Sequence, residues 1–143
     1  MGLDTPEEKM SKSIAVKKPN HAVLLLDPPD VVRRKIARAQ TDTEPAVHEP
    51  VGAGVANLID IYAALHDIDF KTALAEFEGK PYSALKGAVA DAIIAALEPI
   101  QQRYREIRAN DAGLLSQLAD SAERVATIAN ATLHRVQVAV GLR

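Results

Sequence analysis

Aliphatic residues recur at spacings of three and four over most of this chain, and that period constrains the fold more than any other feature. It runs from residue 55 to residue 136, with breaks near Gly79 and Asn110. Such spacing places side chains on one face of an α-helix, whereas a half-buried strand would alternate. Only 3% of the residues are aromatic although 48% are hydrophobic, so aliphatic stripes must supply most of the core. The pattern predicts an all-α fold, a bundle of about five helices.

Most of the predicted helices have a chemical start or stop signal. Asp30 is expected to cap a helix that begins at Val31, and Asp69 to cap a short helix that ends before Gly79. The five helices are predicted from Val31, from about Val55, over Phe70 to Glu78, from Tyr82 to about Arg108, and from Asn110 or Asp111 to Gly141. In the last helix one continuous apolar face is expected, made of Leu114, Leu118, Ala122, Val125, Ile128, Ala129, Leu133 and Val136.

The first 26 residues differ from the rest. Residues 1–20 contain Pro6 and Pro19 and have neither helical nor strand periodicity, which predicts an extended, mobile segment. Residues 21–26 form a short apolar run, expected to be a strand or an extended piece laid on the core.

Charge and composition exclude several classes of function. The net charge of -2 gives the whole chain no attraction for nucleic acid or anionic membranes, so any RNA contact must come from a local patch. Without cysteine, disulfides and thiolate zinc sites are excluded. The four histidines are scattered with no second ligand at helical spacing, so we expect no protein-bound metal site. No apolar run has membrane-spanning length, which favours a cytoplasmic protein.

One short motif carries recognisable chemistry: Lys9-Met10-Ser11-Lys12-Ser13. Two ammonium groups three positions apart, with a hydroxyl beside each, suit a polyphosphate ligand. Met10 would anchor the loop through its apolar side chain. The motif supplies charge and hydrogen-bond donors but no acid, base or nucleophile, so it would act by positioning and charge neutralisation. The alternative is a flexible, solvated basic tail.

The same five letters are the signature loop of class I aminoacyl-tRNA synthetases, and the chain resembles the tryptophanyl-tRNA synthetases beyond it. Six further segments match that family in order: Leu25 to Asp30, Arg38 to Asp42, Gly54 to Tyr62, Phe77 to Tyr82, Leu97 to Tyr104, and Ala126 to Leu133. Collinear matches of this kind are far more specific than any one of them.

The resemblance implies a function and a division of the chain. Residues 1–26 would be the end of a catalytic domain, and residues 27–143 a helical domain that binds the tRNA anticodon. The ligands implied are ATP with magnesium as its counter-ion, tryptophan and its tRNA, and the family is homodimeric. Lys9 and Lys12 would steady the departing pyrophosphate. The nucleotide-binding Rossmann fold and the histidine signature of these enzymes are absent, so the chain resembles a C-terminal part and should not activate tryptophan alone.

Basic residues on the helices are the candidates for tRNA contact. By resemblance the better-placed ones are Lys80, Tyr82, Lys86 and Arg103, with Tyr82 able to stack on an unpaired base or simply to close the core. A denser cluster, Arg33, Arg34, Lys35 and Arg38, could face phosphates, but we favour a solvated face balanced by Asp30 and Asp42.

Two other functions remain open. The tyrosyl-tRNA synthetases share the lysine loop, and the residues that select the amino acid would lie outside this chain. A non-catalytic helical module that binds tRNA, or supports a dimer, and works with a separate chain is the alternative from another class.

Overall fold

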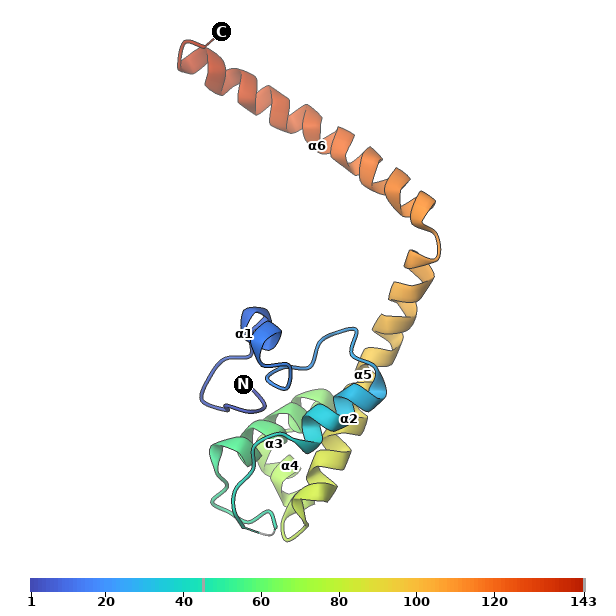
Figure 1. Ribbon diagram of the computed structural model, residues 1–143. Coiled ribbons are helices and arrows are strands. Elements are labelled where there is room, and N and C mark those ends of the chain that lie inside the picture. Colours follow the sequence, from blue (N-terminus) through green and yellow to red (C-terminus); the bar gives the residue numbers. More distant parts are fainter. Residues whose placement is uncertain (45, 143) are drawn as a thin grey trace. The chain divides into compact units, whose positions relative to one another are not determined.

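The computed structural model describes residues 1–44 and 46–142, and within them the fold is all-α, as predicted (Figure 1). This part of the chain contains six helices and no strand. They are α1 (Lys12–Lys17), α2 (Pro29–Ala37), α3 (Ala53–His66), α4 (Phe70–Phe77), α5 (Tyr82–Arg108) and α6 (Asp111–Ala139). None of these helices is both long and apolar enough to cross a membrane.

The chain divides into two compact units, Met1–Gln101 and Gln102–Arg143. Helix α5 continues through the boundary between them. The boundary predicted between residues 26 and 27 separates two functional parts rather than two compact units, and it stays a prediction.

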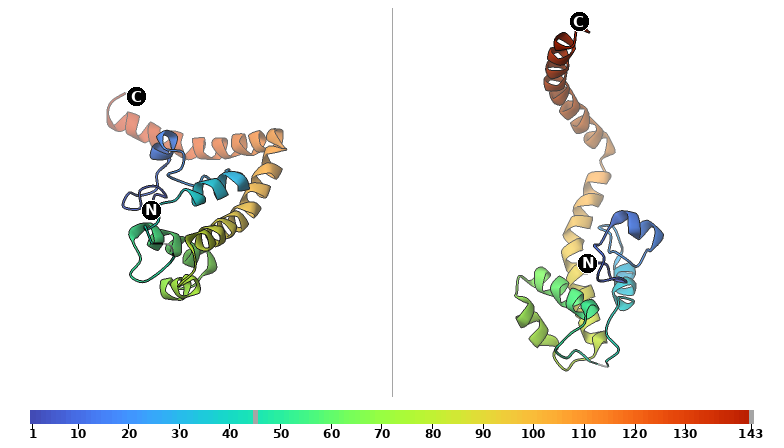
Figure 2. Two further views of the ribbon diagram at one scale, coloured as in Figure 1. Left: turned by 60° about the horizontal axis from the view of Figure 1, so that its bottom comes forward. Right: turned by 90° about the vertical axis from the view of Figure 1, so that its left-hand side faces the viewer.

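The first unit has one aliphatic core, to which α2, α3, α4 and the first part of α5 all contribute (Figures 1 and 2). Its fully buried side chains include Ile36, Leu58, Ile59, Leu85 and Val89. These positions recur at the helical spacing read from the sequence, so the stripes on each helix converge on a common centre. The aliphatic stripe of α5 is buried only at its start, where Leu85 and Val89 lie, since Ile93 and Leu97 are half-buried and Ile100 is exposed.

Two of the predicted helix starts can be compared with the structure. The Asp69 side chain accepts a hydrogen bond from the backbone N–H of Thr72 at 2.9 Å, so the predicted cap of α4 is confirmed. The predicted cap of α2 is wrong: the helix begins at Pro29, and Asp30 lies in its first turn. Proline is well tolerated at the first helical position because its fixed φ suits the helix and it has no N–H to leave unpaired.

The N-terminal segment is more ordered than predicted. It forms the short helix α1, and Leu3 and Ala22 are buried although no periodicity marked them. Of the two forms expected for residues 21–26, the strand is absent; the run starts as an extended piece on the core, with Ala22 buried and Val23 packed against it, but Leu24, Leu25 and Leu26 are exposed. A lone extended run with no neighbouring strand cannot satisfy a ladder of hydrogen bonds, so the apolar run does not make a strand.

In the second unit, α6 begins at Asp111, as predicted. Asn110 caps it, since its side chain accepts a hydrogen bond from the backbone N–H of Gly113 at 3.0 Å. The left-handed Gly141, with φ of 74°, follows its end. However, the structure shows no buried residue in α6, and Val125 and Ile128 are 63% and 73% exposed. The second unit by itself therefore leaves the predicted apolar face of α6 uncovered.

Candidate nucleotide-binding loop and basic surface

The lysine motif lies at the entry to α1. Ser11 is the N-cap residue in an extended conformation, and Lys12 opens the helix. The side chains of Lys9, Lys12 and Ser13 are exposed. Met10 is partly buried and packs against the core, which is the position expected of an anchor. Both ammonium groups are therefore presented to solvent on a segment that is tied to the fold through Met10.

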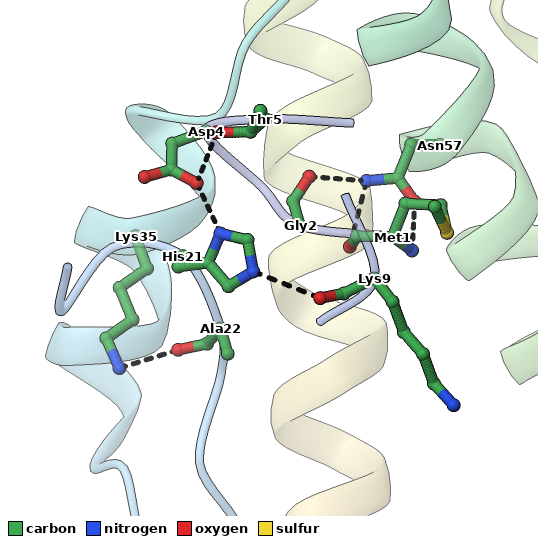
Figure 3. Close-up of polar contacts among 9 residues, drawn as sticks. All are labelled: Met1, Gly2, Asp4, Thr5, Lys9, His21, Ala22, Lys35 and Asn57. Carbon is green, nitrogen blue, oxygen red and sulfur yellow. Dashed lines mark hydrogen bonds and ion pairs between the residues drawn. The ribbon is translucent and has the colours of Figure 1, made fainter. Parts of the chain in front are cut away.

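A buried histidine also contacts the segment that carries the lysine motif (Figure 3). His21 has no solvent exposure, and its Nδ1 lies 2.6 Å from Asp4 Oδ1 while its Nε2 lies 3.3 Å from the carbonyl oxygen of Lys9. The Lys9 side chain extends away from this ring (Figure 3). The main chain of Lys9 is therefore held, while its ammonium group is not part of the contact.

Further bonds join the start of the chain to the same place. The backbone N–H of Leu3 donates to the carbonyl of His21 at 2.9 Å, and the N–H of Gly2 donates to the carbonyl of Glu8 at 2.8 Å. A Cβ atom added to Gly2 would overlap the His21 ring, so only glycine fits there without a shift. Asn57, buried on α3, donates to the carbonyl of Gly2 at 3.2 Å. Asn57 thus has a structural role, as a buried amide whose bonds are satisfied by the backbone.

The carboxyl group of Asp4 is charged in this setting. Burial alone would raise its pKa, but the hydrogen bond and positive charge of His21, with further bonds from its own backbone and Thr5, outweigh burial and hold the pKa of Asp4 below 3.8. Sequence reasoning missed the pairing of Asp4 with His21, because 17 residues separate them and no local pattern marks either one.

The basic cluster on α2 is largely paired within the fold. Arg33 lies 2.6 Å from Asp91 on α5, and Arg34 lies 3.9 Å from Asp30. The solvated-face interpretation is wrong for Lys35, which is buried and donates to the Ala22 carbonyl at 2.9 Å and to Asp27 at 2.6 Å.

Asp42, expected to balance the basic cluster, has a structural role in a loop. Its carboxylate accepts a hydrogen bond from the backbone N–H of Gly52 at 2.8 Å.

The four predicted tRNA-contacting residues lie in different settings. Lys80 is exposed, with its Nζ 5.6 Å from the centre of the Phe77 ring. Lys86 donates to the carbonyls of Ala37 and Ala39 at 3.1 and 2.8 Å, where a cation complements the end of α2. Burial lowers the pKa of Lys86.

Tyr82 and Lys86 line a cavity of about 420 Å³ together with Arg33, so the fold brings two of the four residues together. Burial and the nearby charges of Asp42 and Glu44 raise the pKa of Tyr82, which keeps its hydroxyl protonated. Arg103 belongs to the second unit and lies 3.2 Å from Glu106. The structure leaves the tRNA role of all four residues a prediction.

Over residues 1–44 and 46–142 there is no group of three or more histidine, cysteine, aspartate or glutamate side chains that could hold a metal ion.

Similarity to known proteins decides the family. Residues 1–98 match the family described as tRNA synthetases class I (W and Y). The chain belongs to this family of class I synthetases. The match covers the lysine loop and all of α2, α3 and α4. The sequence-based assignment to the class I synthetases is therefore confirmed.

Relatives extend the similarity to the rest of the chain. A tryptophan-tRNA ligase of Wolinella succinogenes is 43% identical over 99% of the chain, and one of Clostridium acetobutylicum is 39% identical over 99%. A crystal structure of tryptophanyl-tRNA synthetase from Mycoplasma pneumoniae superposes with a TM-score of 0.63 at 32% identity, covering 74% of this chain and 34% of that one. The chain spans 43% of the Wolinella enzyme and 42% of the Clostridium enzyme.

Proposed function

We propose that this chain is the C-terminal part of a tryptophan-tRNA ligase, which charges tRNA-Trp with tryptophan at the expense of ATP. The observation that carries the proposal is the similarity of almost the whole chain to tryptophan-tRNA ligases, together with two exposed lysines on a loop whose main chain is anchored. The cytoplasm is the compartment that this role implies.

The chemistry assigns a limited task to the loop. In the first step a carboxylate oxygen of tryptophan bonds to the α-phosphorus of ATP, and the bond to the bridging oxygen breaks to release pyrophosphate. Negative charge builds on the leaving group, and the ammonium groups of Lys9 and Lys12 would neutralise it. The tRNA hydroxyl then attacks the adenylate carbonyl and AMP leaves.

Magnesium enters this proposal only as a counter-ion of the ATP phosphates. The described residues offer no cluster of ligands for it, so we assign it no protein ligand in this chain.

The test compares the 143-residue chain alone with the chain mixed with the remaining N-terminal portion of a relative. Tryptophan-dependent exchange of pyrophosphate into ATP should be absent in the first case and present in the second. In the complemented enzyme, Lys9→Ala or Lys12→Ala should each lower the exchange rate about 100-fold, because a preorganised charge at the leaving group is removed. Lys17→Ala, an exposed lysine of α1 outside the motif, is the matched control. Normal exchange by the chain alone would contradict the proposal.

The alternatives give different results in the same assay. The family description covers both W and Y enzymes, so a parallel reaction uses the N-terminal portion of a tyrosyl-tRNA synthetase with tyrosine. Because the residues that select the amino acid lie outside this chain, exchange with the tyrosyl portion but not with the tryptophanyl portion would identify a tyrosyl enzyme. Binding of tRNA that depends on the anticodon, with no exchange under any complementation, would identify a non-catalytic module. Sedimentation of the chain and of the complemented enzyme tests the homodimer and the separate catalytic chain that the resemblance implies.

The tRNA surface has its own test. Substituting Lys80 or Arg103 by alanine should weaken binding of tRNA-Trp and reduce the slope of log affinity against log salt by about one for each phosphate that is no longer neutralised. A slope that both variants leave unchanged would remove these two residues from the interface.

A further inference from the structure

The strongest unassigned feature is the buried imidazole that touches two separate stretches of the N-terminal segment. His21 has no exposed surface, yet both of its ring nitrogens face oxygen atoms, Asp4 Oδ1 at 2.6 Å and the Lys9 carbonyl at 3.3 Å. Neither partner belongs to the metal, acid or base machinery of a site in this chain. The residue on which they converge is the first lysine of the proposed phosphate-binding loop.

The two partners of His21 determine how many hydrogen bonds its ring must donate. A backbone carbonyl only accepts, and a carboxylate only accepts, so each bond requires the ring nitrogen to donate. Neutral imidazole has one N–H and can make one of the two bonds, whereas the imidazolium has two and makes both. The protonated ring therefore bonds to both Asp4 and the Lys9 carbonyl, whereas the neutral ring can bond to only one of them.

The other charged groups nearby are engaged elsewhere. On α2, Lys35 is bonded to the Ala22 carbonyl and to Asp27, and the N-terminal ammonium is bonded to Asn57 on α3. The Lys9 ammonium extends away from the ring (Figure 3). Asp4 is thus the charged group bonded directly to the ring.

We propose that His21 is a positioning residue for the signature loop, which in its protonated form fixes the main chain of Lys9 and so the point from which the Lys9 ammonium reaches a bound polyphosphate. This inference rests on the proposed function and adds to it a residue outside the five-letter motif. It also makes the order of the loop depend on pH: the loop is held at low pH and loosened as the imidazole loses its proton.

The first experiment needs no substitution. Hydrogen exchange of the 143-residue chain, expressed as protection factors, is measured from acidic to alkaline pH, so that the ring with two N–H groups is compared with the ring that has one. The amides of Gly2, Glu8 and Ala15, each with a backbone bond beside the loop, report on the segment, and Ala73 in α4 is the reference. Protection at the loop should fall about fivefold to tenfold as pH rises, the effect of removing one hydrogen bond, while Ala73 stays constant. Equal behaviour of loop and reference amides would overturn the inference.

Two substitutions separate the two bonds. The amide nitrogen of His21→Asn lies about where Nδ1 lies and can reach only Asp4, whereas that of His21→Gln lies about where Nε2 lies and can reach the Lys9 carbonyl. We expect His21→Asn to give low, pH-independent loop protection, and His21→Gln to keep the protection that the natural chain has at low pH. His48→Asn is the matched control, because His48 also lies beside a carboxylate, Glu78 at 3.0 Å, but in an exposed pair.

Exchange activity of the complemented enzyme gives the functional readout. His21→Asn should lower kcat for pyrophosphate exchange about tenfold, which corresponds to the loss of one hydrogen bond that positions the loop. His21→Gln should restore kcat, and His48→Asn should leave it unchanged. A loosened loop with an unchanged kcat would refute the positioning role. Should the unsubstituted complemented enzyme show no exchange, the proposed function fails, and the hydrogen-exchange result alone then decides whether His21 holds the loop.

Discussion

Lys35 and Arg34 are neighbours on α2 and differ completely in what their charges do. The Lys35 side chain is 7% exposed, and its ammonium is bonded to the carboxylate of Asp27, whose side chain is 12% exposed, and to the Ala22 carbonyl. Arg34 is 54% exposed and lies 3.9 Å from an exposed Asp30. The sequence shows two adjacent cations, whereas the fold gives one a structural role and leaves the other at the surface.

This contrast predicts different effects on stability. Lys35→Met leaves the Asp27 carboxylate buried without its cation, and should lower the free energy of unfolding by about 3 kcal/mol. Arg34→Met removes an exposed pair and should change it by less than about 1 kcal/mol. Urea unfolding followed by circular dichroism measures both, and a similar decrease in the two variants would contradict the buried role of Lys35.

Asp4 predicts a pH dependence of stability. Its pKa is lowered in the folded state, so its stabilising effect is present above the ordinary value of 3.8 and is lost as pH falls through the lowered folded value. Because the side chain is 30% exposed, we expect Asp4→Asn to cost only about 1 kcal/mol at about pH 6. The difference between the variant and the natural chain should shrink as the solution is acidified below the ordinary value, as measured by urea unfolding at each pH. A difference that persists unchanged in acid would show that the charge of Asp4 is not responsible.

At the scale of helices, two glycines within helices have opposite surroundings. A Cβ added at Gly54 in α3 would overlap the main-chain carbonyl oxygen of Gln40, which cannot move without the chain around it. A Cβ added at Gly87 in α5 meets nothing within 4 Å. The same substitution should therefore have opposite signs at the two sites.

Gly87→Ala should stabilise the chain by about 0.5–1 kcal/mol, because alanine loses less backbone entropy in a helix than glycine. Gly54→Ala should destabilise it by about 1–3 kcal/mol, because the main chain at Gln40 can no longer approach so closely. Thermal and urea unfolding of both variants, read at the same wavelength, give the comparison. Stabilisation at both positions would show that helix propensity alone decides.

The helices were predictable where their signals are local. Apolar spacing found α3 and the length of α5, and Asp69 and Asn110 marked two starts correctly, because a cap acts on an N–H three residues ahead. The start of α2 differs from the prediction because Pro29, with its fixed φ, takes the first helical position ahead of Asp30 and Val31. Helix α1 was missed because six residues are too few to show a period. The anchoring of the loop by Asp4 and His21 depends on contacts between distant residues, which no spacing rule reveals.

At the scale of the whole chain, the family match and the compact first unit end close together, at residues 98 and 101. The buried core lies entirely within that unit, while α6 has no buried residue. The two units should therefore differ in local stability, since regions with few buried contacts open most easily.

Hydrogen exchange of the intact chain measures that difference. Amides of Leu58 and Ile59 in α3, whose side chains are fully buried, should exchange only on cooperative unfolding of the first unit. Amides of Val125 and Ile128 in α6 should show roughly 100-fold lower protection, because their helix opens without disrupting a core. Protection in α6 equal to that in α3 would mean that its apolar face is covered in solution, for example by a second copy of the chain.

The attachment of Lys9 by its carbonyl oxygen, rather than by its side chain, offers a way to watch the loop at work. Residue 9 can be exchanged while the tie to His21 remains, and the chain has no cysteine of its own. Lys9→Cys would thus give a single thiol for a fluorescent dye, on a backbone whose resting position is fixed. Stopped-flow emission from that dye would time the approach of the loop to a nucleotide, separately from the chemistry that follows.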